Sequence, residues 1–267
     1  MLIRPMRPAD LAVASDICTR NGWGDMTSLF AFQLAHDRCH MFVGEVDGEV
    51  IATGTGTHRG DVGWVGQISV LPGYRGRGYG TAMTRHVMDV MAGLGCRSLL
   101  LFATEMGRPI YERLGFELES EFVVWAGAGL ASCAGVRSLV AADLDWVCEL
   151  DRAAMGEDRG PQLRAFASGG WAVASGGGFL IPTPWGTQAA TAATAEAGRA
   201  LVDLMRAVKH LEPDGVRICL PAANRPGAEY LVSLGFRQMT RIPRMLLGAP
   251  VVWNPDMVYG RMSGALD

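Results

Sequence analysis

The chain of 267 residues has no apolar run that approaches the roughly 18 residues needed to cross a bilayer. Its amino terminus also lacks the basic start and short apolar stretch of a secretory signal. These absences argue against a membrane-spanning or secreted protein, and they favour a cytoplasmic one.

Cysteine is sparse and scattered through the sequence, at positions 18, 39, 96, 133, 148 and 219. No two cysteines have C-x-x-C spacing, and no histidine stands near them at the spacing of a metal site. The pattern excludes a disulfide framework. It predicts reduced side chains that pack inside a cytoplasmic protein, with no bound metal.

Lysine is almost missing, since Lys209 is the one lysine among 24 lysine and arginine residues. The formal net charge is −3 and no dense basic run exists, which argues against nucleic acid as a partner. The same bias, with 35 glycines, suggests a GC-rich bacterial coding sequence. A hydrophobic fraction of 49% supplies ample core, and the length suits one large domain or two ordinary ones.

The most informative segment is a glycine- and arginine-rich loop between an apolar run and a helical pattern. The apolar run ends at Pro72, and glycines follow at positions 76, 78 and 80. Without Cβ atoms such a loop can curl so that its backbone N–H groups converge on an anion. Arg75 and Arg77 add positive charge. The segment therefore predicts a phosphate or pyrophosphate site at a helix start. The apolar positions of that helix are Met83, Val87, Val90, Met91 and Leu94.

The spacing distinguishes this loop from two other phosphate loops. A Walker loop needs a lysine and a hydroxyl residue after its last glycine, but Thr81 and Ala82 follow here. A Rossmann fingerprint needs G-x-G-x-x-G, so the last interval here is wrong, and the next predicted strand carries no acid for a ribose. The pattern R-x-x-G-x-G at Arg75, Gly78 and Gly80 resembles the pyrophosphate loop of the GNAT acetyltransferase superfamily, which binds acetyl-CoA.

A second motif follows in the order that this family shows. Gly107-Arg108-Pro109-Ile110-Tyr111 leads into Leu114-Gly115-Phe116, which resembles the short helix, tyrosine and turn of GNAT proteins. The resemblance implies that Tyr111 protonates the leaving thiolate, and a phenol is a suitable acid for that step. The alternative is a half-buried tyrosine that packs a helix on a sheet. Ile3–Leu11 resembles the family's first strand and helix start, so the resemblance covers roughly residues 2–125.

The resemblance implies an α/β (α+β) fold with a mixed, mostly antiparallel sheet and helices on both faces. We expect strands near 2–5, 40–46, 49–57, 63–71, 98–103 and 116–124, and helices near 9–20, 26–38, 80–94 and 107–114. The fourth strand of such a fold is bulged and splays from the fifth, and pantetheine lies between them like an added strand. The N–H groups of Ile68 and Val70 are expected at the depth of pantetheine and thioester, with Ile68 as the oxyanion donor. The expected cofactor-binding residues are Ile68, Ser69, Val70, Leu71, Arg75, Gly76, Arg77, Gly78, Tyr79, Gly80 and Thr81.

The second part of the chain repeats elements of the first. Val140-Ala141-Ala142-Asp143-Leu144 matches the segment that starts at Met6. Asn224-Arg225-Pro226 matches Gly107-Arg108-Pro109, and Leu234-Gly235-Phe236 repeats the second motif. The glycine-rich loop does not recur in the segment 182–189, which follows an apolar run and contains two prolines, and Leu231 takes the place of Tyr111. The whole resembles YitH-like tandem GNAT proteins, which implies an acetyl-CoA-binding domain at 1–127 and a degenerate domain at 135–267.

The degenerate domain is expected to need a partner surface. Its predicted helix presents an apolar face that the first domain's sheet edge or a second copy of the chain can bury, so a homodimer is one arrangement considered. The residues of this face are Leu201, Leu204, Met205 and Val208.

The residues do not identify a general base or an acceptor. Trp64 and Gly66 stand where many GNAT enzymes carry a carboxylate or histidine. The candidates for the base are His58, Asp61 and Glu105, or a chain of water molecules.

The segment between the first two helices is expected over the acceptor side. Asp25 can hold an ammonium there and Trp23 can pack on a substrate, with Glu105 as a third candidate substrate residue. The alternative is a helix cap at Asp25 and a core tryptophan.

The resemblance implies an acetyl-CoA-dependent N-acetyltransferase that acts on a small-molecule amine such as an amino acid, an antibiotic or a metabolite. Two alternatives stay open. One is a protein N-acetyltransferase, and the other is a non-catalytic regulator that binds acyl-CoA.

Overall fold

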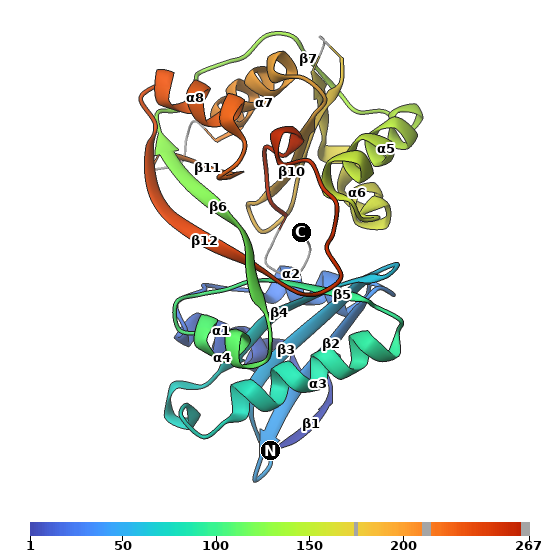
Figure 1. Ribbon diagram of the computed structural model, residues 1–267, viewed down its shortest axis with the longest axis vertical. Helices are drawn as coiled ribbons and strands as arrows, with labels where there is room; N and C mark the ends of the chain where they lie inside the picture. The colour runs from blue at the N-terminus through green and yellow to red at the C-terminus, as the bar shows by residue number, and fades with distance from the viewer. Residues whose placement is uncertain (174–175, 210–214, 263–267) are drawn as a thin grey trace. The chain divides into compact units, whose positions relative to one another are not determined.

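The computed structural model describes residues 1–173, 176–209 and 215–262, and these form two compact units (Figure 1). The first unit consists of Met1–Glu117 and Met245–Pro250. The second consists of Leu118–Arg244 and, among the described residues, 251–262. The expected domain division at 1–127 and 135–267 stays a prediction, because compactness does not test whether either part folds independently.

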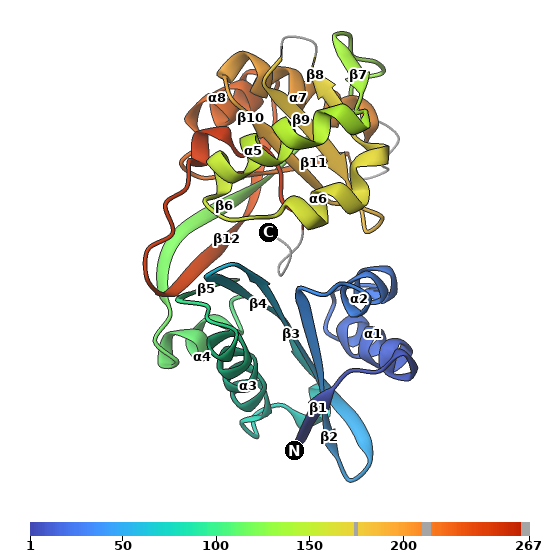
Figure 2. The same cartoon turned by 90° about the vertical axis from the view of Figure 1, so that its right-hand side faces the viewer.

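The first unit is built on a sheet with the strand order β1-β2-β3-β4-β5, followed by the end of β12. β1 to β4 pair antiparallel, and β4 pairs parallel with β5. Helix α3 covers one face, and α1 and α2 cover the other (Figure 2). The strands are β1 (Leu2–Pro5), β2 (Cys39–Val46), β3 (Glu49–Arg59), β4 (Val62–Val70) and β5 (Ser98–Phe102). The helices are α1 (Leu11–Arg20), α2 (Thr27–Leu34), α3 (Tyr79–Gly93) and α4 (Arg108–Arg113).

This architecture confirms the predicted mixed, mostly antiparallel sheet with helices on both faces. Each strand and helix expected in this half is present. The largest difference in bounds is at α2, which ends at Leu34 rather than near residue 38. The chain has to turn there, because β2 starts at Cys39.

Glycines in β3 allow α3 to pack closely on the sheet. A Cβ built on Gly54 would lie 2.5 Å from Met83 Cγ, and one on Gly56 would lie 2.6 Å from Met91 Cε. Met83 and Met91 are fully buried, so the predicted apolar face of α3 is confirmed for them. The prediction is wrong for Leu94, which follows the last helical residue and is 43% exposed.

Strand β4 carries the expected bulge. In the β3–β4 ladder Thr53 lies opposite Ser69, whereas Thr55 lies opposite Gly66, so two residues of β4 face one residue of β3 between these pairs. Gln67 lies in this bulge and has a φ of 46°, in the left-handed region that side chains other than glycine rarely adopt.

Strands β4 and β5 separate after Trp64, just before the bulge. Their parallel pairing extends from Val62 and Ser98 to Trp64 and Leu100. β4 then continues to Val70 without a further recorded partner on that side among the described residues. The splay predicted from the family resemblance is confirmed.

The first unit is completed by a segment from the far end of the sequence. Met245 is fully buried in its core, together with residues of β5 and α4. The backbone N–H of Ala249 donates to Arg97 O at 3.2 Å, and Ser98 Oγ donates to Ala249 O at 2.6 Å. A Cβ on Gly248 would lie 2.2 Å from Arg97 O, and its φ of 99° also requires glycine.

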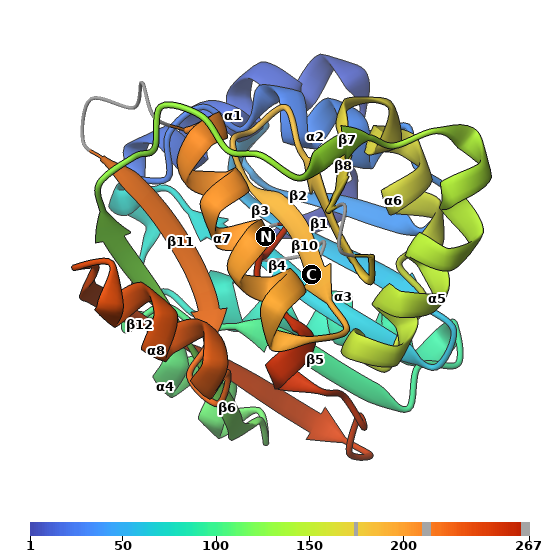
Figure 3. The same ribbon diagram turned by 90° about the horizontal axis from the view of Figure 1, so that it is seen from above.

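The second unit contains a four-stranded antiparallel sheet in the order β10-β9-β8-β7 and a separate pairing of β11 with β6. Helices α5 and α6 lie on one face of the four-stranded sheet and α7 on the other (Figures 2 and 3). Its strands are β6 (Glu117–Gly127), β7 (Val136–Ser138), β8 (Trp171–Val173), β9 (Gly178–Pro182), β10 (Gln188–Ala192), β11 (Val216–Pro221) and β12 (Arg237–Gly248). Its helices are α5 (Leu144–Met155), α6 (Gly160–Phe166), α7 (Ala195–Val208) and α8 (Arg225–Ser233).

The repeat predicted from the sequence is present in atomic detail. Arg4 Nη1 donates to Asp10 Oδ2 at 2.7 Å, and Arg137 Nη1 donates to Asp143 Oδ2 at 2.6 Å. The same carboxylate oxygens each accept a backbone N–H three residues earlier, at 2.8 Å in both halves. Together with the matching order of strands and helices, these braces identify two copies of one fold.

The structure corrects the expected match of the two Arg-Pro segments by one helical turn. Gly107 N donates to Thr104 Oγ1 at 3.1 Å, and Gly227 N donates to Asn224 Oδ1 at 2.9 Å, so Thr104 is the counterpart of Asn224. The match of Leu231 with Tyr111 is unaffected, because it follows from the Leu-Gly-Phe turns. The two Arg-Pro sequences do not occupy equivalent positions, because α8 is nine residues long and α4 is six.

In the second half, the apolar face of α7 is present with one exception. Leu201, Leu204 and Met205 are buried, but Val208 is the last helical residue and is 43% exposed.

Candidate functional site

The loop between β4 and α3 has the conformation of an anion cradle. After the short helix Pro72–Tyr74, Gly76 and Gly78 adopt φ angles of 77° and 81°. Cβ atoms built on these two glycines would meet nothing within 4 Å, so the loop is open on that side. Gly78 is the N-cap of α3 and has no side chain to satisfy the first N–H groups of the helix. Those donors are available to an anion.

The predicted arginines lie on this loop and are exposed. Arg77 lies over the ring of Tyr74, with the guanidinium carbon 5.4 Å from the ring centroid, and its Nη2 donates to Gly73 O at 3.4 Å. Arg75 Nε makes a long contact of 3.4 Å with Val70 O. These weak contacts leave both charges free to turn toward a pyrophosphate beside the helix start.

Gly80 has a different role from the other two glycines. It lies inside α3, where a Cβ would be 3.6 Å from Ile110 Cδ1 and 3.9 Å from Val70 Cγ2. These are ordinary van der Waals distances, so a Cβ at Gly80 would fit beside α4, which carries Tyr111.

The end of β4 offers a backbone donor on the side of the splay. Leu71 N donates to Ile51 O of β3 at 2.8 Å, and the two-residue alternation of a strand then turns the N–H group of Val70 away from β3. Ile68 lies in the bulge itself, where this alternation is interrupted, so its role as a donor stays a prediction. Asn21 Nδ2, at the end of α1, donates to Ser69 Oγ at 2.7 Å and to Val70 O at 3.2 Å. The expected residues Ile68–Leu71 therefore lead directly from the splay into the loop.

Tyr111 lies in α4 and is 9% exposed. Its ring packs edge to face against Phe116, with centroids 6.0 Å apart. Burial raises the pKa of Tyr111 to about 12. The phenol is therefore protonated at neutral pH, as a proton donor must be.

The two candidate acceptor-binding residues, Trp23 and Asp25, lie between α1 and α2 and differ in their surroundings. Trp23 is 38% exposed, so the alternative of a core tryptophan is wrong. Asp25 Oδ1 accepts hydrogen bonds from Thr27 Oγ1 at 2.6 Å, Thr27 N at 2.9 Å and Ser15 Oγ at 2.8 Å. These bonds, first that of the Thr27 hydroxyl, lower the pKa of Asp25 to about 2. The N-cap of α2 is Met26, so the alternative of an N-cap at Asp25 is off by one residue, although Asp25 does bond the first helical N–H, that of Thr27. An ammonium-binding role stays a prediction.

Two of the base candidates are held by other side chains. Asp61 is in contact with the guanidinium of Arg97, and this hydrogen bond lowers the pKa of the Asp61 carboxyl. His58 and His40 share a contact of 3.0 Å between ring nitrogens. Glu105 is exposed in the turn after β5.

Sequence reasoning gave no role to Gln33, which the structure brings next to the bulge of β4. Gln33 is fully buried in α2, and its Nε2 lies 3.4 Å from Oε1 of Gln67 in the bulge. A lone glutamine in the apolar stretch Phe30–Leu34 was the available signal, but its partner is 34 residues away in sequence.

The second unit differs at the counterpart of the loop. The prediction that residues 182–189 occupy the position of the glycine-rich loop is wrong, because β9 and β10 form a hairpin in which Pro182 pairs with Gln188. The segment from β10 to α7 is instead Ala193 and Thr194. Thr194 caps α7 by accepting a hydrogen bond from Ala197 N at 3.2 Å. This helix start satisfies one of its own donors.

The second unit also fills the counterpart of the splay with its own chain. Tyr259 N donates to Ala190 O at 2.8 Å, and Val258 bridges to Thr191, so the segment lies beside β10 as an added strand. Asn224 Nδ2 donates to Val258 O at 2.8 Å. The order of elements makes β10 the counterpart of β4, so this segment takes the place expected for pantetheine.

The ring of Tyr259 anchors this segment between α7 and α8. It is 1% exposed, and a Cβ on Gly198 of α7 would lie 2.0 Å from its Cζ. A Cβ on Gly227 of α8 would lie 3.0 Å from its Cε1. Both helices thus use glycine to accommodate the ring.

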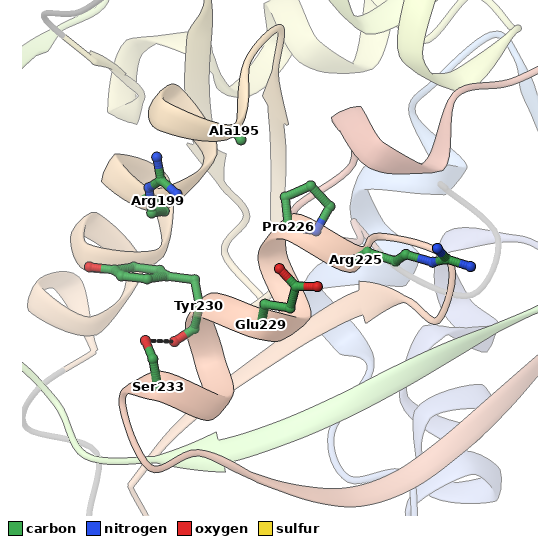
Figure 4. A pocket seen from close by; sticks show the side chains of 7 residues that line it. All are labelled: Ala195, Arg199, Arg225, Pro226, Glu229, Tyr230 and Ser233. Atoms are coloured by element: carbon green, nitrogen blue, oxygen red, sulfur yellow. Dashed lines mark hydrogen bonds between the residues drawn. The ribbon is translucent and has the colours of Figure 1, made fainter.

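A pocket of about 530 Å³ lies between the same two helices (Figure 4). Tyr230 extends toward α7, where its hydroxyl donates to Asp203 Oδ2 at 2.8 Å. Four lining residues, Arg199, Arg225, Glu229 and Ser233, are exposed. The lining residues are Ala195, Arg199, Arg225, Pro226, Glu229, Tyr230 and Ser233. This is an open polar groove, and it contains none of the predicted site residues.

The comparison with protein families matches residues 12–116 to the acetyltransferase (GNAT) family. A glucosamine 6-phosphate N-acetyltransferase of Trypanosoma brucei brucei is 36% identical over 55 residues, 21% of this chain and 37% of that protein. An acetyltransferase of Yersinia pestis is 27% identical over 105 residues, 38% of this chain and 74% of that protein. The chain thus spans little more than a third of the length of the first of these relatives.

Solved structures resemble the whole chain. A candidate acetyltransferase of Pyrococcus horikoshii has a TM-score of 0.84 at 22% identity and covers 99% of this chain and 95% of its own. A GCN5-related N-acetyltransferase of Sphaerobacter thermophilus has a TM-score of 0.63 at 17% identity, with 94% and 97% covered. A tandem GNAT protein from the clavulanic acid biosynthesis pathway has a TM-score of 0.63 at 15% identity, with 93% and 99% covered. At these identities the likeness establishes the fold, which is that of a tandem GNAT protein.

Two further findings concern the environment of the chain. Within the part of the chain that the structure describes, no helix combines the length and the apolar character needed to cross a membrane. The six cysteines are free thiols.

Proposed function

This chain belongs to the acetyltransferase (GNAT) family through residues 12–116, and on that premise we propose that it moves an acetyl group from acetyl-CoA to the amine of a small molecule. The transfer is direct, from the thioester to the amine, with no acyl-enzyme. The first unit carries the reaction, and the second has no cofactor site.

The observation that carries the proposal is that the bulge of β4 and the glycine-rich loop before α3 follow one another directly in the chain. The bulged end of β4 leads within a few residues into a loop with two left-handed glycines and an uncapped helix start. A helix start of this kind suits the pyrophosphate, and the unpaired side of β4 suits an extended pantetheine arm. The residues present therefore fit acetyl-CoA.

The backbone of the bulge supplies the oxyanion donor in this proposal. The N–H of Ile68, which lies in the bulge, donates in this proposal to the thioester oxygen as negative charge develops on it. One such donor is worth about 3–4 kcal/mol where water is excluded. The rest of the site holds amine and thioester in contact, which removes much of the entropic barrier.

Tyr111 supplies the proton for the leaving thiolate. The burial that raises its pKa to about 12 also removes water from the neighbouring thiolate and makes that group more basic. Because burial raises the pKa of both the phenol and the thiol, the difference between the two pKa values changes little, and proton transfer from Tyr111 to the thiolate is feasible.

A small amine is favoured as the acceptor. The relative from Trypanosoma brucei brucei is a glucosamine 6-phosphate N-acetyltransferase, and it is 36% identical over the 55 matched residues. The exposed ring of Trp23, in the segment between α1 and α2, offers a surface for the body of such a substrate.

One observation favours the alternative of a non-catalytic acyl-CoA-binding regulator. No carboxylate stands at Trp64 or Gly66 of β4, and Asp61 is bound to Arg97. The protonated, buried Tyr111 favours the enzyme instead. A protein acceptor is the third candidate, and the structure offers no specific feature for it.

The test is a panel of amines with acetyl-CoA, followed by release of free thiol. The panel includes glucosamine, glucosamine 6-phosphate, amino acids, aminoglycosides and a lysine peptide. We expect thiol release with at least one small amine. Tight binding of acetyl-CoA without thiol release from any amine would contradict the enzyme and favour the regulator.

A further inference from the structure

The two faces of β3 differ in chemistry. On the α3 side it presents Gly54 and Gly56, which contact apolar side chains. On the other face, which α1 and α2 cover, it presents Thr53, Thr55 and Thr57, all at most 1% exposed. A buried wall of hydroxyls is unusual in a core, because each hydroxyl needs a hydrogen-bond partner.

Two glutamines lie on this polar side, and their hydrogen bonding is incomplete. Gln33 is fully buried, Gln67 is 6% exposed, and one contact of 3.4 Å joins their amides. Among the described residues, Gln33 Oε1 and Thr55 Oγ1 are shielded from solvent and have no hydrogen-bond partner. Such atoms normally find partners in a folded protein, so a polar group of a bound molecule is a candidate partner for them.

The backbone places Gln67 next to the reacting atoms of the proposed site. Its φ of 46° is unfavourable for a glutamine, and the bulge that requires it also contains the next residue, Ile68, which is the proposed oxyanion donor. The side chain of Gln67 is thus one residue from the oxyanion donor.

The polar side lacks a carboxylate. Among the described residues of the first unit, the buried carboxylate is Asp10, which is bound to Arg4 at the other end of α1. The charged or titratable groups on the elements packed there are Asp16, Cys18 and Arg20 of α1, Glu49, His58 and Arg59 of β3, and Asp25 and His36 beside the two ends of α2. The carboxylates among them, Asp16, Asp25 and Glu49, are exposed. Asp25 is held by Thr27 and Ser15.

We propose that the amide pair Gln33–Gln67 binds the acceptor amine in its uncharged form, with Gln67 in contact with the amine and Gln33 positioning Gln67. This inference rests on the proposed function. The oxygen and nitrogen of an amide have the same shape, so the pair can turn over and present the oxygen of Gln67 to the amine N–H.

A neutral acceptor explains the missing base. A carboxylate beside an ammonium would stabilise the charged form, whereas burial against amides destabilises it. The ammonium therefore loses its proton to solvent as it enters. The free amine forms the N–C bond, the C–S bond breaks, the thiolate takes the proton of Tyr111, and the nitrogen releases its surplus proton to solvent, from which Tyr111 is reprotonated.

The experiment compares Gln67→Glu and Gln33→Leu with the wild type, using the best amine of the panel. In Gln67→Glu the new carboxylate should shift the acidic limb of the pH profile of kcat, which reports groups in the enzyme–substrate complex, upward by about one unit. In Gln33→Leu kcat/KM should fall about tenfold. The melting temperature of Gln33→Leu should stay or rise, because an unpaired buried amide is removed.

The matched control is Gln162→Leu in α6. Gln162 is fully buried, and both of its amide atoms lack partners, but it belongs to the second unit. It should keep wild-type transfer.

The outcomes separate the two claims. Absence of thiol release by the wild type would overturn the proposed function and this inference with it. A working wild type with an unshifted pH profile in Gln67→Glu, or a Gln33→Leu variant that loses stability rather than kcat/KM, would overturn the inference alone.

Discussion

The two long helices α3 and α7 occupy matching places in the two halves but start differently. α3 follows a loop with two left-handed glycines, and its N-cap Gly78 offers no side chain. α7 follows two residues, and the hydroxyl of its N-cap Thr194 accepts a helix N–H. The comparison teaches that one fold gains or loses an anion site through the few residues before a helix.

The strands before these helices show the same contrast. β4 is bulged and pairs with β5 only as far as Trp64 among the described residues, whereas the counterpart side of β10 is bonded to Tyr259 and bridged to Val258. The second half closes its splay with its own chain, and in the proposed function the first half binds an external molecule there. A site can thus disappear by being filled as well as by losing its residues.

The largest expected effect comes from separating the halves. Residues 1–130 alone lack the strand end that carries Met245 and bonds to Arg97 and Ser98. The loss is comparable with the roughly 5–15 kcal/mol that holds a domain folded. We expect this fragment to be poorly soluble and to bind acetyl-CoA weakly, and we expect residues 243–251, attached by a flexible linker, to restore both. A fragment that melts at the temperature of the full chain would show that the strand is dispensable.

The second effect tests the filled splay. Tyr259→Ala removes a ring that lies between two glycines, and it should destabilise the second unit by about 3–5 kcal/mol in chemical unfolding. Acetyl-CoA affinity should not change. Val252→Ala, at a residue 87% exposed in the same segment, is the control and should leave the unfolding curve unchanged. A Tyr259→Ala variant as stable as the control would disprove the anchoring role.

The third effect concerns the proton donor of the first half. Tyr111→Phe should lower kcat at least about 100-fold, since a general acid contributes roughly that much, while the Kd of acetyl-CoA stays the same. Tyr230→Phe, which removes a hydroxyl bonded to Asp203 in the second unit, is the control. Full turnover in Tyr111→Phe would remove this residue from the mechanism.

Much of the first half could be predicted because its signals are local. The glycines at 76 and 78 and the apolar spacing of α3 indicate loop and helix directly, and the bulge followed from the family resemblance. The contribution of the end of β12 to the first unit could not be predicted, because the contact of Ser98 with Ala249 joins residues 151 positions apart. The Gln33–Gln67 pair has the same difficulty.

The second half was harder to interpret for a physical reason. An apolar strand followed by prolines at 182 and 184 has the composition of a strand before a loop, but here it forms the first arm of a hairpin. The next strand, β10, is made of small residues and gives a weak hydrophobic signal. The loop position was therefore assigned one strand too early.

The smallest expected effect concerns the arginine–aspartate pair that both halves contain, Arg4–Asp10 and Arg137–Asp143. Hydrogen bonds from Arg4 and Arg137 lower the pKa values of Asp10 and Asp143 respectively. Carboxylates with lowered pKa values stabilise the fold above the unfolded value of about 4 and lose this effect as the pH falls. Asp10→Asn and Asp143→Asn should each cost about 1–2 kcal/mol at pH 7.

The costs should differ between the halves and depend on pH. The cost should be larger at Asp10, because the side chain of Arg4 is 19% exposed and that of Arg137 is 52%. Both costs should shrink below about pH 4 in unfolding titrations. Costs that do not depend on pH would contradict the charge-based brace.

The central claim is that the cofactor site lies in the first half alone, and calorimetric titration with acetyl-CoA tests it most directly. The account predicts one site per chain for the wild type and no binding by Gly78→Val. Gly186→Val should bind normally, although Gly186 has a φ of 83° against 81° for Gly78, and a Cβ on either meets nothing within 4 Å. Two sites per chain, or undiminished binding by Gly78→Val, would contradict it.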